Sequence, residues 1–250
     1  MLVGQYIGTF NQTGWSTRFR EEIPLHLLTR LYLAFALIDK DGLHWEDEGK
    51  VLQVLQQLKK VNPAAEVFAS VQDDVGLLRG AFDPGFSKKV LLFLQKYQLQ
   101  GLDLDWEENL EERSLSHLVE HLSRLLRPAG MKLTLAAWPF WMRAYNASVL
   151  RIHLDQINLM SYGAGLNLSE VVDDFVSHGF PPDILIGGVS TEWSGETDSL
   201  GVNGSIAQKV RIARERNLVG MMAWRVDNDY GSEETPSYKG AHQLWNSARS

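Results

Sequence analysis

The sequence predicts a (β/α)8 barrel, the TIM-barrel fold, formed by residues 1–250 as a single domain. Short apolar runs rich in β-branched and aromatic residues recur along the chain and alternate with segments of helical periodicity. This alternation is typical of a parallel sheet covered by helices. Eight such runs occur in 250 residues, and eight is the number of strands that closes this type of barrel.

The elements follow one another in a regular order. The apolar runs predicted as strands are Leu2–Ile7, Arg30–Leu37, Glu66–Val71, Leu99–Asp105, Lys132–Ala137, Gln156–Met160, Asp183–Val189 and Gly220–Trp224. Between several of them, apolar residues recur at helical spacing. The clearest of these segments are Asp47–Lys60, Phe86–Tyr97, Leu115–Leu126, Ser169–Ser177 and Ile206–Arg216.

An open, doubly wound sheet is the alternative fold. It would usually carry a glycine-rich phosphate-binding turn after its first strand. Here Gly8-Thr9-Phe10-Asn11 follows that strand, and no GxGxxG or GxxxxGK[ST] sequence is present in the chain. These observations favour the closed barrel, and no linker-like segment divides it.

Composition excludes several kinds of site and partner. The chain has no cysteine, so a disulfide, a thiol nucleophile and a thiolate zinc site are all excluded. Its formal net charge of −7 argues against a nucleic-acid partner. No apolar segment is long enough to span a membrane, and the first residues do not resemble a signal peptide. We therefore expect no nucleic-acid or membrane partner, and a monomer.

The most informative stretch is the fourth predicted strand. Because strand side chains alternate between faces, Asp103, Asp105 and Glu107 share one face while Leu102 and Leu104 share the other. In a barrel the three acids would line the interior and rise to the C-terminal rim, where active sites of this fold lie. Buried, closely spaced carboxyl groups raise one another's pKa, so at least one should hold a proton near neutral pH. Such a group suits general-acid catalysis of glycosidic cleavage.

The stretch Asp103-Leu104-Asp105-Trp106-Glu107 closely resembles the DxxDxDxE signature of family 18 glycoside hydrolases, the chitinases and endo-β-N-acetylglucosaminidases. Three further segments resemble strands of that family in the right order: Arg30–Ala36, Gln156–Tyr162 with its Met160-x-Tyr162 ending, and Gly220–Asp227 with Trp224. The resemblance thus covers most of the chain. It implies hydrolysis of N-acetylglucosamine-containing polysaccharides without a cofactor.

The chain departs from the family pattern at three places. Gln100 stands for the first acid of the signature, at a position we expect to lie deepest and to concern barrel packing. Gly163 follows Tyr162 where the family often has Asp, and Ser70-Val71-Gln72-Asp73 replaces a Ser-x-Gly-Gly sequence. The missing Asp puts the pH optimum and the rate in doubt more than the reaction type.

The resemblance implies a substrate-assisted, retaining mechanism. In it, Glu107 is the general acid and base, Asp105 orients the acetamido group of the sugar, Asp103 tunes Asp105, and Tyr162 hydrogen-bonds the acetamide carbonyl. Trp224 would form the floor of the sugar site, with its indole N–H free to hydrogen-bond. Further candidates for substrate binding are Tyr6, Met160, Trp138, Trp193 and Glu192.

Only about two dozen residues separate Trp193 from Gly220. Many family chitinases insert a small α/β module there, so we expect a barrel without that module and an open groove that cleaves internal bonds. Alternatives are an endo-β-N-acetylglucosaminidase acting on N-glycans or peptidoglycan-type glycans, and an inactive chitin-binding lectin. Polymers of this kind lie mostly outside cells, which favours an extracellular location only weakly.

Two metal-like patterns are not interpreted as sites. His117-Leu118-Val119-Glu120-His121 matches HxxEH, but it falls on a predicted outer helix, where surface histidines are the simpler explanation. Asp227-Asn228-Asp229 resembles part of a calcium loop without its remaining ligands. We expect a turn there and no metal.

Overall fold

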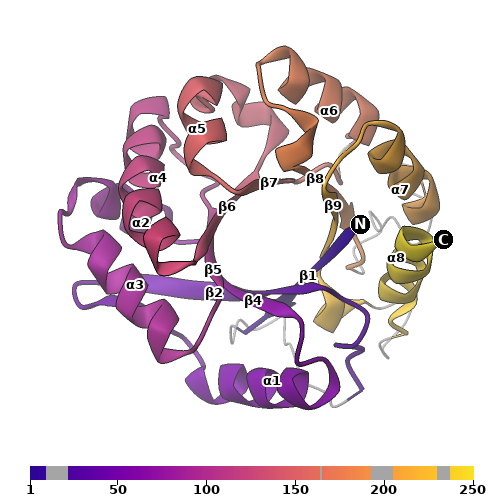
Figure 1. Ribbon diagram of the computed structural model, residues 1–250, viewed down its shortest axis with the longest axis horizontal. Helices are drawn as coiled ribbons and strands as arrows, with labels where there is room; N and C mark the ends of the chain where they lie inside the picture. The colour runs from indigo at the N-terminus through magenta and orange to yellow at the C-terminus, as the bar shows by residue number, and fades with distance from the viewer. Residues whose placement is uncertain (10–21, 164, 193–204, 230–236) are drawn as a thin grey trace.

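A closed ring of strands forms the centre of the molecule, and helices surround it (Figure 1). The computed structural model describes residues 1–9, 22–163, 165–192, 205–229 and 237–250. Around the ring lie β1 (Leu2–Gly8), β2 (Arg30–Asp39), β4 (Glu66–Val71), β5 (Gly101–Asp105), β6 (Lys132–Ala137), β7 (Gln156–Leu159), β8 (Leu185–Ser190) and β9 (Gly220–Trp224). All neighbours pair in parallel, and β1 closes the ring by pairing with β2 and β9. The predicted (β/α)8 barrel is confirmed.

Helices connect the strands on the outside of the ring. They are α1 (Glu48–Val61), α2 (Asp74–Phe82), α3 (Phe86–Lys96), α4 (Glu112–Leu126), α5 (Ala147–His153), α6 (Leu168–Ser177), α7 (Ile206–Glu215) and α8 (Lys239–Arg249). The five periodic segments of the sequence form α1, α3, α4, α6 and α7. Helix boundaries follow local signals: the Asp47 side chain, for example, accepts a hydrogen bond of 2.9 Å from the Lys50 N–H at the start of α1.

Four elements were not among the predicted ones. Helix α2 contains two glycines and α5 has only seven residues, and both features weaken a periodic signal. Helix α8 was also not predicted. A short strand, β3 (Gly42–Trp45), pairs antiparallel with the end of β2. None of these elements interrupts the ring.

The strands separate two apolar layers. The larger layer lies between the strands and the helices and includes Leu31, Leu102 and Leu104, all fully buried. The smaller layer fills the barrel interior with Tyr6, Tyr32, Ala34, Phe35, Phe68, Ala136, Met160, Ile186 and Met222. The alternation of side chains along β5 therefore places its leucines outside and its acids inside. No helix in the described ranges is long and apolar enough to cross a bilayer.

A buried ionic group closes the barrel interior near the start of the strands. Arg30, at the beginning of β2, is 1% exposed, and its Nε donates to Glu66 Oε2 at 3.0 Å. Its guanidinium also donates to Gln156 and lies 4.3 Å from the centroid of the Phe68 ring. This ion pair lies at the N-terminal ends of β2 and β4, whereas active sites of this fold lie at the opposite, C-terminal end of the strands.

Candidate active site

Strand β5 carries the acidic residues into the interior of the barrel. Asp103 and Asp105 are buried, and they alternate with Leu102 and Leu104 in the outer layer. Gly101 lies in the same phase as the acids, and a Cβ there would come within 2.6 Å of the Phe68 ring. A side chain at position 101 would therefore collide with the interior aromatic layer.

Asp103 is bound by hydrogen-bond donors from four other strands. Tyr6 Oη and Ser70 Oγ donate to Oδ2, each at 2.8 Å. Thr134 Oγ1 and Asn158 Nδ2 donate to Oδ1 at 2.5 Å and 3.2 Å. Burial raises the pKa of Asp103 to about 6, and the donors oppose that rise because they favour the ionised form.

Asp105 is the next inward-facing residue of β5, towards the C-terminal end of the strand, and its environment differs from that of Asp103. Within the described ranges, its Oδ1 atom has no hydrogen-bond partner although it is buried. Burial raises the pKa of Asp105 well above its usual range, and the neighbouring carboxylates of Glu107 and Asp103 raise it further. These effects favour the protonated form of Asp105, which can share its proton with an acidic neighbour or with a bound group.

Glu107, at the mouth of the barrel, is partly exposed and fixed from one side. Gln72 Nε2 donates to Glu107 Oε1 at 2.8 Å. The backbone N–H groups of Glu107 and Glu108 donate to the two oxygens of Asp74, at 3.1 Å and 3.0 Å. These contacts come from Gln72, just after β4, and from Asp74, the first residue of α2. They orient Glu107 while leaving it accessible.

Tyr162 and Trp224 flank the acids at the same end. Tyr162 follows β7 and packs against the interior aromatic layer, as does Trp224 at the end of β9. Burial raises the pKa of the Tyr162 hydroxyl, and the charges of Asp105 and Glu107 raise it further, so this phenol remains a hydrogen-bond donor. A Cβ at Gly188 would approach the Tyr162 ring to 3.0 Å, so glycine at that position makes room for the ring.

The indole of Trp224 is held on several sides. Its ring stacks on Phe35 with centroids 5.7 Å apart and lies 5.8 Å from Tyr6. Its Nε1–H donates to Glu192 Oε2 at 3.0 Å. The indole N–H, expected to be free to hydrogen-bond, therefore bonds to a buried carboxylate of the protein.

Comparison with known proteins decides the family. The family model described as "Glycosyl hydrolases family 18" matches residues 3–201. The chain belongs to glycosyl hydrolase family 18. A Pinctada maxima protein with the name "Putative chitinase" is 31% identical over 100 residues, which cover 35% of this chain and 22% of that protein. The chain spans only about a quarter of the length of the curated relatives that it matches.

Solved structures of family 18 proteins share the barrel. A Cycas revoluta GH18 chitinase mutant in complex with (GlcNAc)4 superposes with a TM-score of 0.79 at 18% identity, covering 99% of each chain. Human YKL-39, described as a pseudo-chitinase with retained chitooligosaccharide binding properties, gives a TM-score of 0.79 at 17% identity over all of both chains. These likenesses confirm the fold. Family membership and the names of the relatives support the prediction of a glycosidase.

Two of the departures from the family 18 pattern make contacts of their own near β4 and β5. Gln100 is exposed just before β5, where its Oε1 accepts from the Val67 N–H at 2.7 Å. It therefore tethers the start of β4 instead of packing inside the barrel, which corrects our expectation. The segment that replaces Ser-x-Gly-Gly supplies Ser70 to Asp103 and Gln72 to Glu107. Sequence reasoning did not identify either contact, nor those of Thr134 and Asn158.

Glu192 belongs to a buried ionic group beside Trp224. Its Oε1 accepts from Asn228 Nδ2 at 2.7 Å and lies 3.3 Å from Arg225 Nε. Arg225 is 1% exposed and also lies 3.6 Å from Asp227. Glu192 thus contacts the neighbouring loop and the indole of Trp224.

The remaining candidates are placed as follows. The hydroxyl of Tyr6 donates to Asp103 at the base of the acidic line. Met160 is buried in the interior layer, and Trp138 packs partly buried against it. Trp193 lies outside the described residues. His117 and His121 face each other on the outer helix α4, with ring centroids 4.1 Å apart.

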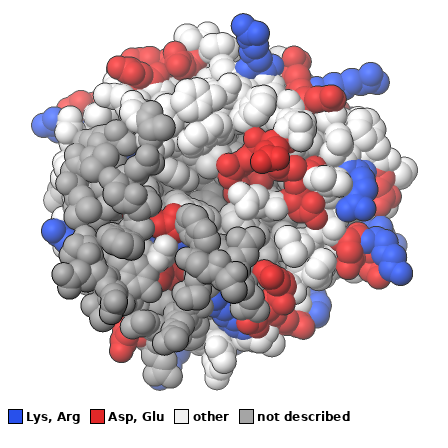
Figure 2. Space-filling model, turned by 180° about the vertical axis from the view of Figure 1, so that it is seen from behind, with Lys and Arg blue, Asp and Glu red and all other residues white. Residues whose placement is uncertain are grey.

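A single turn of 3-10 helix, η5 (Val226–Asn228), begins the segment for which the sequence predicts a turn. The carboxylate of Asp229 accepts from the N–H groups of Gly240 and Ala241 at the start of α8. No group of three or more potential metal ligands occurs in the described ranges. Acidic side chains gather beside the middle of the face opposite to that of Figure 1, whereas Lys and Arg lie mainly at its margin (Figure 2).

Proposed function

We propose that this family 18 protein hydrolyses β-1,4-linked N-acetylglucosamine polymers, chitin or chito-oligosaccharides, with Glu107 as the general acid and base. The single observation that carries the proposal is the line of Asp103, Asp105 and Glu107 along the interior face of β5, from a buried position to an accessible one. Beside this line, Tyr162 would provide a hydrogen-bond donor and Trp224 an aromatic surface for an amino sugar.

In the proposed first step, Glu107 protonates the glycosidic oxygen while the carbonyl oxygen of the sugar's own 2-acetamido group attacks the anomeric carbon. The bond to the leaving sugar breaks, and an oxazolinium-like intermediate forms. In the second step, Glu107 removes a proton from water, which opens this intermediate with retention of configuration. This substrate-assisted route is a recognised exception among retaining glycosidases.

Asp105 and Tyr162 would position the acetamido group. The buried Oδ1 atom of Asp105, which has no hydrogen-bond partner in the described part of the chain, would accept the acetamide N–H. The Tyr162 hydroxyl, which remains protonated, would donate to the acetamide carbonyl. Holding the nucleophile in this way converts a bimolecular encounter into a positioned attack.

Asp103 would act behind Asp105 rather than on the substrate. Its four donors hold one orientation of its carboxylate, and its pKa of about 6 lets it exchange a proton near neutral pH. A charge on Asp103 disfavours a second charge on Asp105. When Asp103 is ionised, Asp105 therefore keeps its proton close to Glu107.

The test is cleavage of chitotetraose by the wild-type protein and by Glu107→Gln. We expect the substitution to lower kcat on the order of 10²–10⁴-fold, the usual contribution of general-acid catalysis, with binding retained. Glu108→Gln is the matched control, because Glu108 is the exposed neighbour in the same loop. Undiminished activity of Glu107→Gln would rule out the assignment.

A binding function without hydrolysis is the second candidate, because human YKL-39 shares this fold and is described as a pseudo-chitinase that retains chitooligosaccharide binding. Wild-type protein that binds chitotetraose and cleaves no N-acetylglucosamine polymer would establish it. If hydrolysis occurs, the short segment between Trp193 and Gly220 leads us to propose internal cleavage. Release of disaccharide alone from one chain end would contradict that mode.

A further inference from the structure

A series of hydrogen bonds runs through the barrel interior from the start of β2 to the acidic line. Arg30 Nη1 donates to Tyr32 Oη at 3.3 Å, and Tyr32 Oη donates to Asn158 Oδ1 at 3.3 Å. Asn158 Nδ2 then donates to Asp103 Oδ1 at 3.2 Å and to Tyr6 Oη at 2.9 Å. All five side chains are buried. We call the first four residues the interior hydrogen-bond chain.

The two ends of the interior hydrogen-bond chain fix the direction of its bonds. A guanidinium can only donate, and an ionised carboxylate can only accept. Because Arg30 donates to the Tyr32 oxygen, the phenol proton turns towards the Asn158 carbonyl, and the amide N–H groups of Asn158 turn towards Asp103. Hydrogen bonds aligned in this way polarise one another in a protein interior. Their direction favours a negative charge on Asp103.

Arg30 is not needed to neutralise Glu66, its other partner. Lys132 Nζ donates to Glu66 Oε1 at 2.5 Å, and the Glu66 side chain is 31% exposed. Burial of the Arg30 guanidinium removes it from water, and a single ion pair often fails to offset that cost. Packing 4.3 Å from the centroid of the Phe68 ring compensates part of it. The position of Arg30 therefore suggests an effect on groups inside the barrel.

Titratable groups from the surrounding elements face Asp103. They are Tyr6 on β1, Arg30 and Tyr32 on β2, Asp105 and beyond it Glu107 from β5, and Tyr162 after β7. Strands β4 and β6 add the hydroxyl groups of Ser70 and Thr134, whereas β8 and β9 add apolar side chains. Burial raises the pKa of the three tyrosines, so they stay neutral. Of these groups Arg30 carries the positive charge, and it opposes the rise that burial causes in the pKa of Asp103.

We propose that Arg30 is a positioning residue for the catalytic acids, which acts through Tyr32 and Asn158 to hold Asp103 in its ionised form. The inference rests on the proposed function, in which an ionised Asp103 keeps the proton of Asp105 close to Glu107. It gives a residue at the N-terminal end of the barrel a role in chemistry at the C-terminal end. Without Arg30, Asp103 takes up a proton at a higher pH.

The test is a 13C NMR titration of the Asp103 carboxyl group, which requires no substrate. Asp103→Asn assigns the signal by its absence. Arg30→Met removes the charge and leaves Glu66 paired with Lys132. We expect it to raise the pKa of Asp103 by about one unit, the low end of what an opposite charge causes, because two side chains lie between them. Tyr32→Phe keeps the charge but interrupts the interior hydrogen-bond chain, so it should raise the same pKa by a smaller amount.

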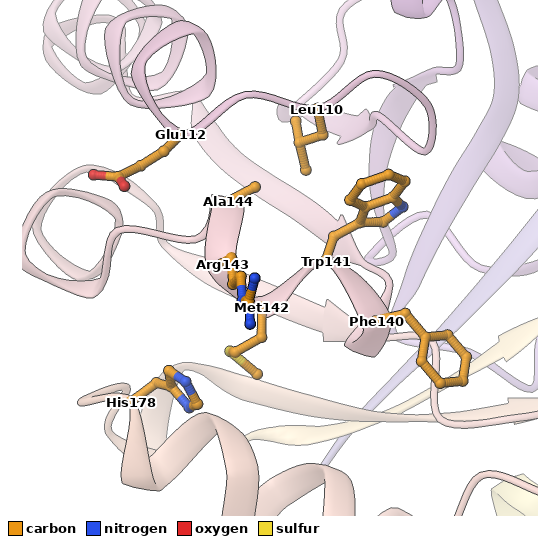
Figure 3. A pocket seen from close by; sticks show the side chains of 8 residues that line it. All are labelled: Leu110, Glu112, Phe140, Trp141, Met142, Arg143, Ala144 and His178. Atoms are coloured by element: carbon orange, nitrogen blue, oxygen red, sulfur yellow. The ribbon is translucent and has the colours of Figure 1, made fainter.

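Arg143→Met is the matched control, because it removes the same charge from an exposed side chain. Arg143 lines a groove on the outside of the barrel, beside the segment that follows β6 (Figure 3). Solvent and salt screen an exposed charge. We therefore expect the titration of Asp103 to be unchanged in this variant.

An unchanged pKa of Asp103 in Arg30→Met would overturn the proposal, as would an equal rise in Arg143→Met. A rise in Arg30→Met with no change in Tyr32→Phe would overturn the interior hydrogen-bond chain as the route. Tyr32→Phe keeps the shape of the ring, so it decides the question alone where Arg30→Met does not fold.

The catalytic role has its own measurement, the pH dependence of kcat on chitotetraose. Activity that requires an ionised Asp103 falls as the pH drops through its pKa, so the acidic limb of the profile should move upward in Arg30→Met by the same amount as the titration. A limb that stays in place while the titration moves would overturn the role in catalysis. If the wild type cleaves no substrate, the proposed function fails, whereas the titration still tests the action of Arg30 on Asp103.

Discussion

The buried charge of Asp103 makes a quantitative prediction about stability and pH. Its pKa is raised from 3.8 to about 6, and burial is the main cause. A carboxyl group with a raised folded-state pKa binds its proton more tightly in the native state than in the unfolded one. Ionisation of Asp103 therefore lowers the free energy of unfolding. This loss is small below pH 3.8 and approaches its full value above about pH 6.

The size of that cost follows from the shift. About two pKa units at 1.36 kcal/mol per unit correspond to on the order of 3 kcal/mol. Replacement of Asp103 by Asn removes the titration but keeps the side-chain shape. Because part of this cost is already present at pH 4, we expect the stability of Asp103→Asn relative to the wild type to rise by roughly 2.5 kcal/mol between pH 4 and pH 7.

Urea unfolding of both proteins across this pH range provides the measurement. The substitution also changes the hydrogen bonds from Tyr6, Ser70, Thr134 and Asn158, but that effect on stability does not depend on pH. The test is therefore how the difference in unfolding free energy between the two proteins changes with pH. Agreement of the m-values would show that both proteins unfold to similar ensembles. A difference in unfolding free energy that stays constant from pH 4 to pH 7 would refute the reasoning.

Two further predictions concern the mouth of the barrel. Glu192→Ala removes one of the two carboxylates beside the buried Arg225, together with the acceptor of the Trp224 indole N–H. We expect a loss of about 3 kcal/mol in unfolding free energy and a lower Tm. An unchanged Tm in thermal unfolding would contradict this. Tyr162→Phe removes the hydroxyl proposed to hold the acetamide carbonyl. In steady-state assays on chitotetraose it should lower kcat by about tenfold to a hundredfold while KM changes little; a rise in KM at constant kcat would instead assign Tyr162 to ground-state binding.

The sequence by itself determined the succession of strands and which face of β5 carries the acids. Alternation along a strand is a property of the backbone, so Asp103 and Asp105 must share a face opposite to Leu102 and Leu104 wherever the strand lies. Runs that are apolar on both faces, separated by helical segments, required a covered parallel sheet. The family signature then identified which acid stands at the rim.

Only the tertiary structure decided which groups surround those acids. Tyr6, Ser70, Thr134 and Asn158 come from four different strands, and they meet at Asp103 because of the register in which the closed barrel pairs those strands. No local pattern encodes that register. For the same reason the sequence did not reveal that Gln72 orients Glu107 or that Glu192 accepts the indole N–H of Trp224. Periodicity is local, whereas a hydrogen bond across a barrel depends on how distant segments are aligned.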